Sequence, residues 1–394
     1  MLKNRIQDLA EDIFKDVVGN RRHLHSNPEL SFHEYETAAF VAARLDELKI
    51  PYQKMADTGL VALIKGNIES DKVVALRADM DALPIDEAND VIYKSKNEGV
   101  MHACGHDVHT SSLLGTAKIL QELKNEFGGT VKLIFQPAEE KLPGGASLMI
   151  KDGVLENPKP GAVIGQHVMP MIDTGKVGFR AGKYMASADE IYVTVKGKGG
   201  HAAQPQQNID SVLITSHLIV ALQQVVSRMN DPKLPCVLSF GKVIANGATN
   251  VIPNEVYLEG TFRTMDEVWR KEAHVRMKKL AEGLAESMGG SCDFNIVTGY
   301  PFLVNEERLT AQVRGFAEAY LGNENVVDLD IWMAAEDFAY YSQVVDSCFY
   351  RLGTRNESRG ITSSVHTPTF DVDEDALKIS TGLMAYIALK RLGN

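Results

Sequence analysis

The nine residues from Met101 to His109 constrain this chain more than any other segment. They hold one thiol, three imidazoles and one carboxylate, namely Cys104, His102, His106, His109 and Asp107. Thiolate and imidazole are preferred ligands of zinc-like ions, and alternate positions on an extended loop can direct Cys104 and His106 at one point. The other three cysteines are scattered singly, which argues against a disulfide. A catalytic thiol beside a histidine base, or a helix start with solvent-exposed histidines, stays open from this segment alone.

A second cluster lies just after a predicted strand. Residues 131–135 form a short apolar run that Pro137 stops, and Glu139 and Glu140 follow at once. Two adjacent carboxylates are costly to hold together unless a cation neutralises them. One of them can then bind a metal while the other transfers a proton. An exposed acidic turn is the ordinary alternative for such a pair by itself.

Two further histidines occupy similar settings. His167 ends the apolar run of residues 162–166, and His366 lies in the segment Val365–Pro368. A single histidine of either kind is more often a core or surface residue than a ligand. Four separate strand-end or loop segments nevertheless each carry ligand-type side chains, which together are Cys104, His106, Glu140, His167 and His366. Because open parallel sheets bind ligands at the carboxyl ends of their strands, we expect one converging site.

Seven motifs in order along nearly the whole chain carry a specific resemblance. They are Arg77–Pro84, Cys104–Asp107, Gln136–Glu140, Gly199–Ala203, Thr249–Pro253, Ala335–Phe338 and His366–Pro368. In these the chain resembles the amidohydrolase branch of the metallopeptidase family that includes aminoacylase, glutamate carboxypeptidase, hippurate hydrolase and the auxin-conjugate hydrolases.

The resemblance implies a metal-dependent hydrolase. Its metal ligands would be Cys104, His106, Glu140, His167 and His366, holding one or two divalent ions such as zinc or manganese. Glu139 would be the general base that takes a proton from a metal-bound water and passes it to the departing amine. Asp81 would sit behind the site and steady it, although an exposed turn acid is an equal alternative. His102 and His109 are left out, because five ligands suffice.

The resemblance also assigns substrate-binding residues. His201, on a glycine-rich turn, would donate to the substrate carbonyl, whereas Asn250 and Arg263 would grip the free carboxylate of the amino acid. A turn histidine, a turn asparagine and a surface-strand arginine are the ordinary alternatives. Relatives pair across a dimer axis, so we expect a homodimer formed through the domain that carries these residues.

The pattern of helices and strands predicts two domains. Residues 1–184 alternate helices and strands, which is typical of an α/β domain with a mainly parallel sheet, and residues 297–394 would return to it. Residues 185–296 read as strand, helix, strand, strand, helix, strand, a ferredoxin-like α+β insertion. The resemblance makes the first a zinc-peptidase-like catalytic domain and the second a lid and dimerisation domain.

Composition is consistent with a soluble cytoplasmic enzyme. The net charge of -11 argues against nucleic acid or an anionic membrane as a partner. The N-terminal segment is amphipathic rather than secretory, no apolar run approaches a membrane span, and unpatterned cysteines fit a reducing compartment.

The predicted function is hydrolysis of the amide bond of N-acyl L-amino acids. A dipeptidase or carboxypeptidase on short peptides, and an inactive metal- or ligand-binding homologue, are the alternatives.

Overall fold

The structure, a computed structural model, describes residues 2–393 and divides into two compact units. The larger unit comprises Met1–Tyr184, Val304–Ile331 and Asp337–Asn394, and the smaller unit comprises Met185–Leu303 and Trp332–Glu336. The chain therefore leaves the larger unit twice, first for a long insertion and then for a short segment, and both belong to the smaller unit.

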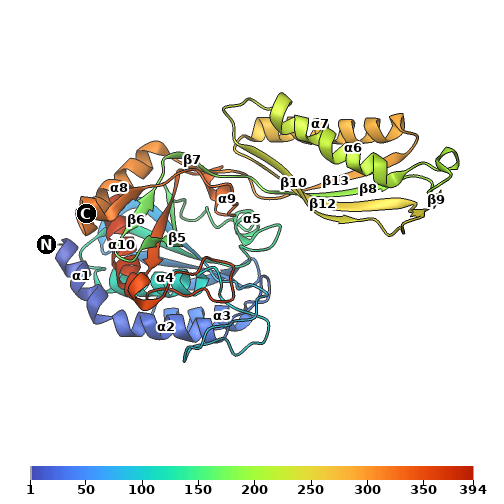
Figure 1. Cartoon of the computed structure of the whole chain (residues 1–394). Helices are drawn as coiled ribbons and strands as arrows, with labels where there is room; N and C mark the ends of the chain where they lie inside the picture. The colour runs from blue at the N-terminus through green and yellow to red at the C-terminus, as the bar shows by residue number, and fades with distance from the viewer. Residues whose placement is uncertain (1, 394) are drawn as a thin grey trace. The chain divides into compact units, whose positions relative to one another are not determined.

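An eight-stranded sheet forms the centre of the larger unit (Figure 1). Its order is β1-β2-β4-β3-β5-β16-β6-β15. Neighbours β4–β3, β3–β5, β5–β16 and β6–β15 are parallel, and the other three pairs are antiparallel. The strands are β1 (Tyr52–Met55), β2 (Gly59–Lys65), β3 (Ile68–Asp79), β4 (Gly128–Gln136), β5 (Val163–Asp173), β6 (Val177–Phe179), β15 (Val326–Asp328) and β16 (Ser347–Arg355). The predicted α/β fold with a mainly parallel sheet is confirmed.

Helices from both ends of the chain belong to the larger unit. They are α1 (Leu2–Asp12), α2 (Phe14–Ser26), α3 (Tyr35–Glu47), α4 (His106–Glu122), α5 (Gly145–Lys151), α8 (Glu307–Leu321), α9 (Ala339–Ser342) and α10 (Asp375–Leu392). The helices α1 and α2 pack on α4 and α10, and the others pack on the sheet. The helix α4 packs against α2, α10 and β3, and nearly all of its residues are buried. The helix that begins at the metal-ligand motif is therefore fixed by the core of the larger unit.

A four-stranded antiparallel sheet with two helices forms the smaller unit (Figure 1). In chain order the elements are β8 (Asp189–Lys196), α6 (Ser211–Gln224), β10 (Cys236–Ile244), β12 (Glu255–Thr264), α7 (Glu267–Ser287) and β13 (Ser291–Thr298). The sheet order is β10-β12-β8-β13. This is the order of a ferredoxin-like βαββαβ layer, and β10 and β13 are its edges.

One helical stretch, Ser211–Met229, is long and apolar enough to cross a membrane by length and composition alone. This differs from the expectation that no apolar run approaches the length of a membrane span. Its side chains Ile214, Leu218, Leu222 and Val225 are buried in the apolar core of the smaller unit. The apolar character of the stretch is thus used at least partly for packing on the sheet.

The strand register brings distant residues to one level of the large sheet. Asp79, the last residue of β3, pairs with Gln136, the last residue of β4. On the other side of β3, Arg77 pairs with Gly165, so His167 lies two residues further along β5. β5 continues to Asp173. His167 is therefore inside a strand rather than at its end, but it stands beside the point where the neighbouring strand stops.

The side chain of Asp210 begins α6 and supplies a test of local stability. It accepts hydrogen bonds from the backbone amides of Val212 and Leu213, both at 2.9 Å. Asp210→Ala removes this cap and should lower the free energy of unfolding by about 1 kcal/mol in urea denaturation. Glu286→Ala, an exposed change on α7, is the control and should stay within about 0.5 kcal/mol. An equal loss in both variants would contradict the capping role.

Candidate metal centre

Cys104 lies in the loop before α4 and His106 is the first residue of that helix, both beside the end of β3 in the large sheet. Gly105, between them, has φ +83 and precedes the first helical residue. A Cβ atom on Gly105 would lie 2.5 Å from a methyl carbon of Val168 on β5. Only glycine satisfies both the backbone conformation and the close approach, and Cys104 and His106 can then face β5.

The ring of His106 has one nitrogen held and one nitrogen free. Its Nδ1 lies 2.8 Å from the backbone carbonyl of Asp81 and 3.2 Å from the Asp81 carboxylate. A carbonyl can only accept, so Nδ1 carries the hydrogen in this contact. The other nitrogen, Nε2, is buried and has no hydrogen-bond partner within residues 2–393. A metal ion that displaces the proton from this nitrogen could therefore bind there.

Asp81 holds several parts of the site at once. Its carboxylate accepts from Ser31 Oγ at 2.6 Å and from the backbone amides of Glu139 at 3.0 Å and Glu140 at 2.9 Å. Together with His106 these are four donors to one buried carboxylate. This geometry suits the steadying role expected of Asp81.

The remaining candidate ligands gather around the Cys104 sulfur. His167 Nε2 and His366 Nε2 each lie 3.3 Å from Sγ. His366 Nε2 is also 3.1 Å from a Glu140 carboxylate oxygen. The backbone carbonyl of Val168, 2.8 Å away, accepts from His167 Nδ1, which leaves the Nε2 lone pair of His167 free.

These side chains form two groups that share one atom. Cys104, His106 and His167 place their ligand atoms within 4.8 Å of one another, and so do Cys104, Glu140 and His366. Thiolate, imidazole and carboxylate are suitable donors for zinc-like ions. The shared sulfur permits two neighbouring ions, one in each group.

The electrostatics of the site favour a cation. Burial disfavours the protonated ring of His106, but Asp79 and Asp81 outweigh burial and raise the pKa of His106 to about 10. Burial and the charges of Glu140 and Glu139 raise the pKa of the Cys104 thiol well above its usual value. A thiolate at Cys104 therefore requires a cation beside it. Burial, aided by Arg351, lowers the pKa of His167 and keeps that ring neutral.

Neither of the two histidines left out of the ligand set joins Cys104 in these groups. His109 uses both ring nitrogens: Nδ1 lies 2.5 Å from the Asp79 carboxylate, and Nε2 accepts from the Val168 amide at 2.9 Å. His102 is buried, and burial lowers its pKa to about 4. His109 thus links β3 to β5 next to His167.

Asp79 and Asp337 line the site without having been predicted. Asp79 could have been found, because it lies two residues from Asp81 at the end of a strand and so shares its face. Asp337 lies in one of the family motifs, but its neighbours in sequence give no sign of the buried contacts of its carboxylate.

In the smaller unit, His201 and Asn250 lie close together. His201 is on the short strand β9 (Gly200–His201), which pairs with β11 (Val251–Ile252), and the Ala202 amide donates to the Asn250 carbonyl at 3.0 Å. The Ala203 amide donates to His201 Nδ1 at 3.1 Å, so a neutral ring carries its hydrogen on Nε2. The exposed His201 can donate from that nitrogen.

Arg263 is not brought to the same place. It lies near the end of β12, opposite Val237 of β10, and its Nε donates to Thr261 Oγ1 at 3.2 Å. Asn250 lies before the start of that strand. Eight residue steps separate Glu255 from Arg263, about 26 Å of strand. Asn250 and Arg263 of one smaller unit cannot hold the same carboxylate.

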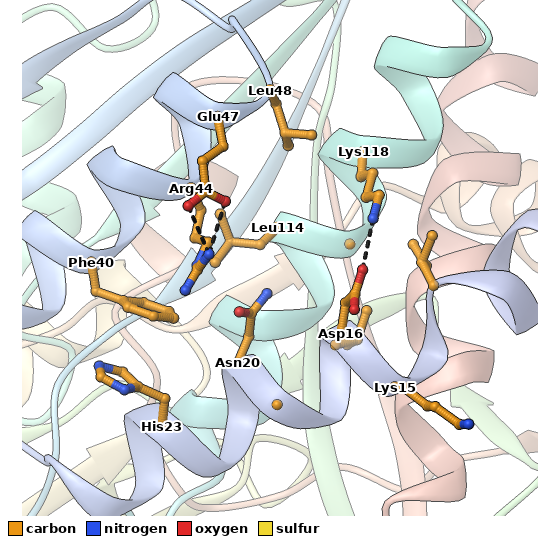
Figure 2. A pocket seen from close by; sticks show the side chains of 14 residues that line it. Lys15, Asp16, Asn20, His23, Phe40, Arg44, Glu47, Leu48, Leu114 and Lys118 are labelled. Atoms are coloured by element: carbon orange, nitrogen blue, oxygen red, sulfur yellow. Dashed lines mark hydrogen bonds and ion pairs between the residues drawn. The ribbon is translucent and has the colours of Figure 1, made fainter.

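A separate hollow of about 540 Å³ lies between α2, α3 and α4 (Figure 2). Two ion pairs line it, Arg44–Glu47 and Lys118–Asp16, with shortest distances of 2.8 and 2.7 Å. None of the candidate metal ligands is among its lining residues. The hollow is therefore distinct from the candidate metal centre.

Comparisons with known proteins match the chain over most of its length. A sequence model of the family described as "Peptidase family M20/M25/M40" matches residues 75–390. An N-acyl-L-amino acid amidohydrolase of Geobacillus stearothermophilus is 42% identical over 306 residues, covering 77% of this chain and 82% of that protein. An N-acetyl-L-cysteine deacetylase of Bacillus subtilis is 40% identical over 379 residues, covering 96% and 88%.

Solved structures agree with the fold. The YxeP protein of Bacillus subtilis, described as a dinuclear metal-binding peptidase of the M20 family, superposes with a TM-score of 0.83 at 34% identity, covering 97% of this chain and 99% of that one. The family resemblance inferred from the seven motifs is confirmed.

Replacing Cys104 distinguishes a metal ligand from a nucleophile. Cys104→Ser should lower metal affinity by at least about 10-fold, because serine is a poorer ligand at neutral pH, and added metal should restore part of the activity. Metal content after dialysis measures the effect. Cys348→Ser, a buried thiol on β16 outside both groups, is the control and should keep its metal. Normal metal content in Cys104→Ser together with a trapped acyl-enzyme in the unmodified protein would instead identify Cys104 as the nucleophile.

Proposed function

The chain belongs to peptidase family M20/M25/M40 and is a hydrolase, and we propose that it hydrolyses the amide bond of N-acyl L-amino acids. The products would be a carboxylic acid and a free amino acid. One observation carries the proposal: two groups of metal-ligand side chains share Cys104, and the Glu139 carboxylate lies directly beside them. Two relatives of about 40% identity are named for this reaction on N-acyl or N-acetyl amino acids.

The larger unit would supply the chemistry. Cys104, His106, Glu140, His167 and His366 would hold one or two divalent ions, such as zinc or manganese. Bound ions of this kind polarise a carbonyl and lower the pKa of a bound water from near 16 to about 7. Glu139, with one carboxylate oxygen 4.0 Å from His106 Nε2, would accept the proton of that water and deliver it to the departing amine.

The smaller unit would supply substrate recognition. His201 would donate from Nε2 to the amide carbonyl oxygen, where negative charge develops. Arg263 would bind the free carboxylate, because its planar guanidinium forms two parallel hydrogen bonds with that group. Asn250 would add a neutral donor.

We infer that the enzyme works as a homodimer. Asn250 and Arg263 lie at opposite ends of β12, so recognition of one substrate by both requires two copies of the smaller unit. An exposed edge is available, because β10 has a neighbour on one side only and exposes Val243 and Ile244. Such an open, apolar edge normally pairs with another strand or is covered. Exposed Val220 on α6 extends the apolar surface of the same unit.

We place the enzyme in the cytoplasm, with a small molecule as its substrate and neither nucleic acid nor membrane as partner. All four cysteines are free. A thiol that must remain an unoxidised ligand is best kept in a reducing compartment.

Two other functions use parts of the same site. A dipeptidase or carboxypeptidase would need the same centre and, in the dipeptidase case, a pocket for a free amine. A protein that binds a metal or ligand without catalysis would not need Glu139 beside the ligands. The position of Glu139 favours an enzyme.

A substrate panel tests the reaction. Purified protein should hydrolyse N-acetyl amino acids, lose that activity with a chelator and recover it with added metal. Glu139→Gln keeps the shape of the side chain but cannot accept the proton, so kcat should fall by at least about 100-fold while metal content is unchanged. Faster turnover of dipeptides than of N-acetyl amino acids would support the peptidase instead, and full activity in Glu139→Gln would remove Glu139 from the mechanism.

Mixing two inactive variants tests the dimer. If His201 acts in the site of the partner, a heterodimer of a Glu139→Gln chain and a His201→Ala chain contains one intact site. Random reassociation makes half of the dimers heterodimers, so the mixture should recover roughly a quarter of unmodified activity. The same variants kept unmixed are the control. No recovery, although size measurements show that mixed dimers have formed, would mean that His201 serves its own chain.

A further inference from the structure

We propose that Asp337 is a positioning residue for Glu139: its side chain is locked by buried donors so that its backbone amide faces the Glu139 carboxylate. The inference rests on the proposed function, in which Glu139 is the general base. The Asp337 amide nitrogen lies 3.4 Å from Glu139 Oε1. Asp337 itself would touch neither the substrate nor the metal.

Three segments hold the Asp337 carboxylate. Arg77 Nη2 on β3 donates to Oδ1 at 2.7 Å, and Gln136 Nε2 at the end of β4 donates to both oxygens at 2.8 and 2.9 Å. The Ala146 amide in α5 donates to Oδ2 at 2.9 Å. Both Asp337 and Gln136 are fully buried. These contacts fix the side chain and the backbone that carries it.

The orientation of the Gln136 amide is set by a further contact. Arg77 Nε donates to Gln136 Oε1 at 2.9 Å, which requires Gln136 to present its NH₂ group to Asp337. Arg77, Gln136 and Ala146 therefore all present donors to the Asp337 carboxylate. An ionised carboxylate satisfies all of them, whereas an asparagine would turn its own NH₂ against one of these donors.

The loop contacts of Glu139 hold its backbone, and the Asp337 amide adds a contact to its side chain. Asp81 accepts from the Glu139 amide, and Ala138, with φ +49, is held by a bond from its amide to Glu34. These contacts set the path of the chain, whereas the rotamer of the long Glu139 side chain depends on the contacts of its carboxylate. An amide donor at Oε1 favours one of them and leaves Oε2 on the side of His106.

Asp337→Asn tests the proposal through a double-mutant cycle. We expect kcat on an N-acetyl amino acid to fall by about 10- to 100-fold, with KM changed by less than about 3-fold and metal content unchanged. In a Glu139→Gln background the same change should lower kcat by less than about 2-fold, because the group it positions is already gone. Equal losses in both backgrounds would overturn the positioning role.

Asp189→Asn is the matched control. Asp189 is also a buried carboxylate held by an arginine, with Arg270 Nε at 3.0 Å and a further bond from the Gly299 amide at 3.2 Å, but it lies in the smaller unit. Any loss of kcat that Asp189→Asn causes should be the same in the unmodified protein and in the Glu139→Gln variant. If Asp337→Asn does not fold, Gln136→Met removes two of the donors while keeping the side-chain volume, and the same cycle applies with a smaller expected loss of about 3- to 10-fold.

Crystal structures of the metal-loaded variants give a readout that does not depend on activity. In Asp337→Asn or Gln136→Met, the Glu139 carboxylate should leave its position beside the residue-337 amide, while Glu140 stays next to His366. A Glu139 carboxylate that keeps its position would overturn the proposal. Failure of the proposed function is seen separately, as a folded, metal-loaded, unmodified protein that hydrolyses no amide in the panel.

Discussion

Buried negative charge is the constraint on which the rest of this structure depends. Asp79, Asp81, Glu139 and Glu140 converge on the ring of His106, and three of the four carboxylates are buried. Isolated buried carboxylates are too costly to keep ionised, so each needs donors or a cation. Asp79 is paired with Arg77 at 2.5 Å, and Asp81 has its four donors. The remaining demand for positive charge lies where Cys104, His106 and His167 present their lone pairs, which is why a divalent ion fits.

The sheet register explains how much of the fold and of the centre could be predicted. An apolar run that is followed by acids or histidines predicts a strand with candidate site residues near its end, as in the run that Pro137 stops. Parallel pairing of such strands then brings their ends together. Glu140 and His167 follow such a local signal, and Cys104 and His106 stand in a dense cluster of ligand-type residues, but the full set including His366 was implied by the family resemblance. The contacts that hold the site from behind could not be predicted. Arg77 and Asp337 are 260 residues apart, and the sequence around each gives no sign that they contact each other. His167 shows the limit within a strand: the apolar run predicts where β5 begins, but its end depends on pairing with β16, which continues to Arg355.

His109 and His102 show why counting imidazoles does not identify ligands. Both are buried in the same motif, yet both nitrogens of His109 are engaged by Asp79 and Val168, whereas His102 is held neutral by burial. The difference comes from partners on β3 and β5 and not from spacing in sequence. His106 differs in its hydrogen bonds: the Asp81 carbonyl fixes one ring nitrogen, and the other has no hydrogen-bond partner among the described residues. The hydrogen bonds of the ring nitrogens thus distinguish a metal ligand from a histidine that only holds the surrounding structure.

The smaller unit extends this reasoning from the centre to the substrate. A ferredoxin-like layer has two open edges, and β12, one of its two central strands, is long enough to separate the groups at its two ends by about 26 Å. An N-acyl amino acid is far smaller than that distance. Under the proposed function, His201 and Asn250 at one end and Arg263 at the other would serve one substrate only if two copies of the layer contribute, one through each end. An isologous pairing of β10 edges relates two layers by a two-fold axis, so that the ends of the two β12 strands point in opposite directions. In the proposed dimer, strand length and edge exposure would thus connect assembly to recognition of the proposed substrate.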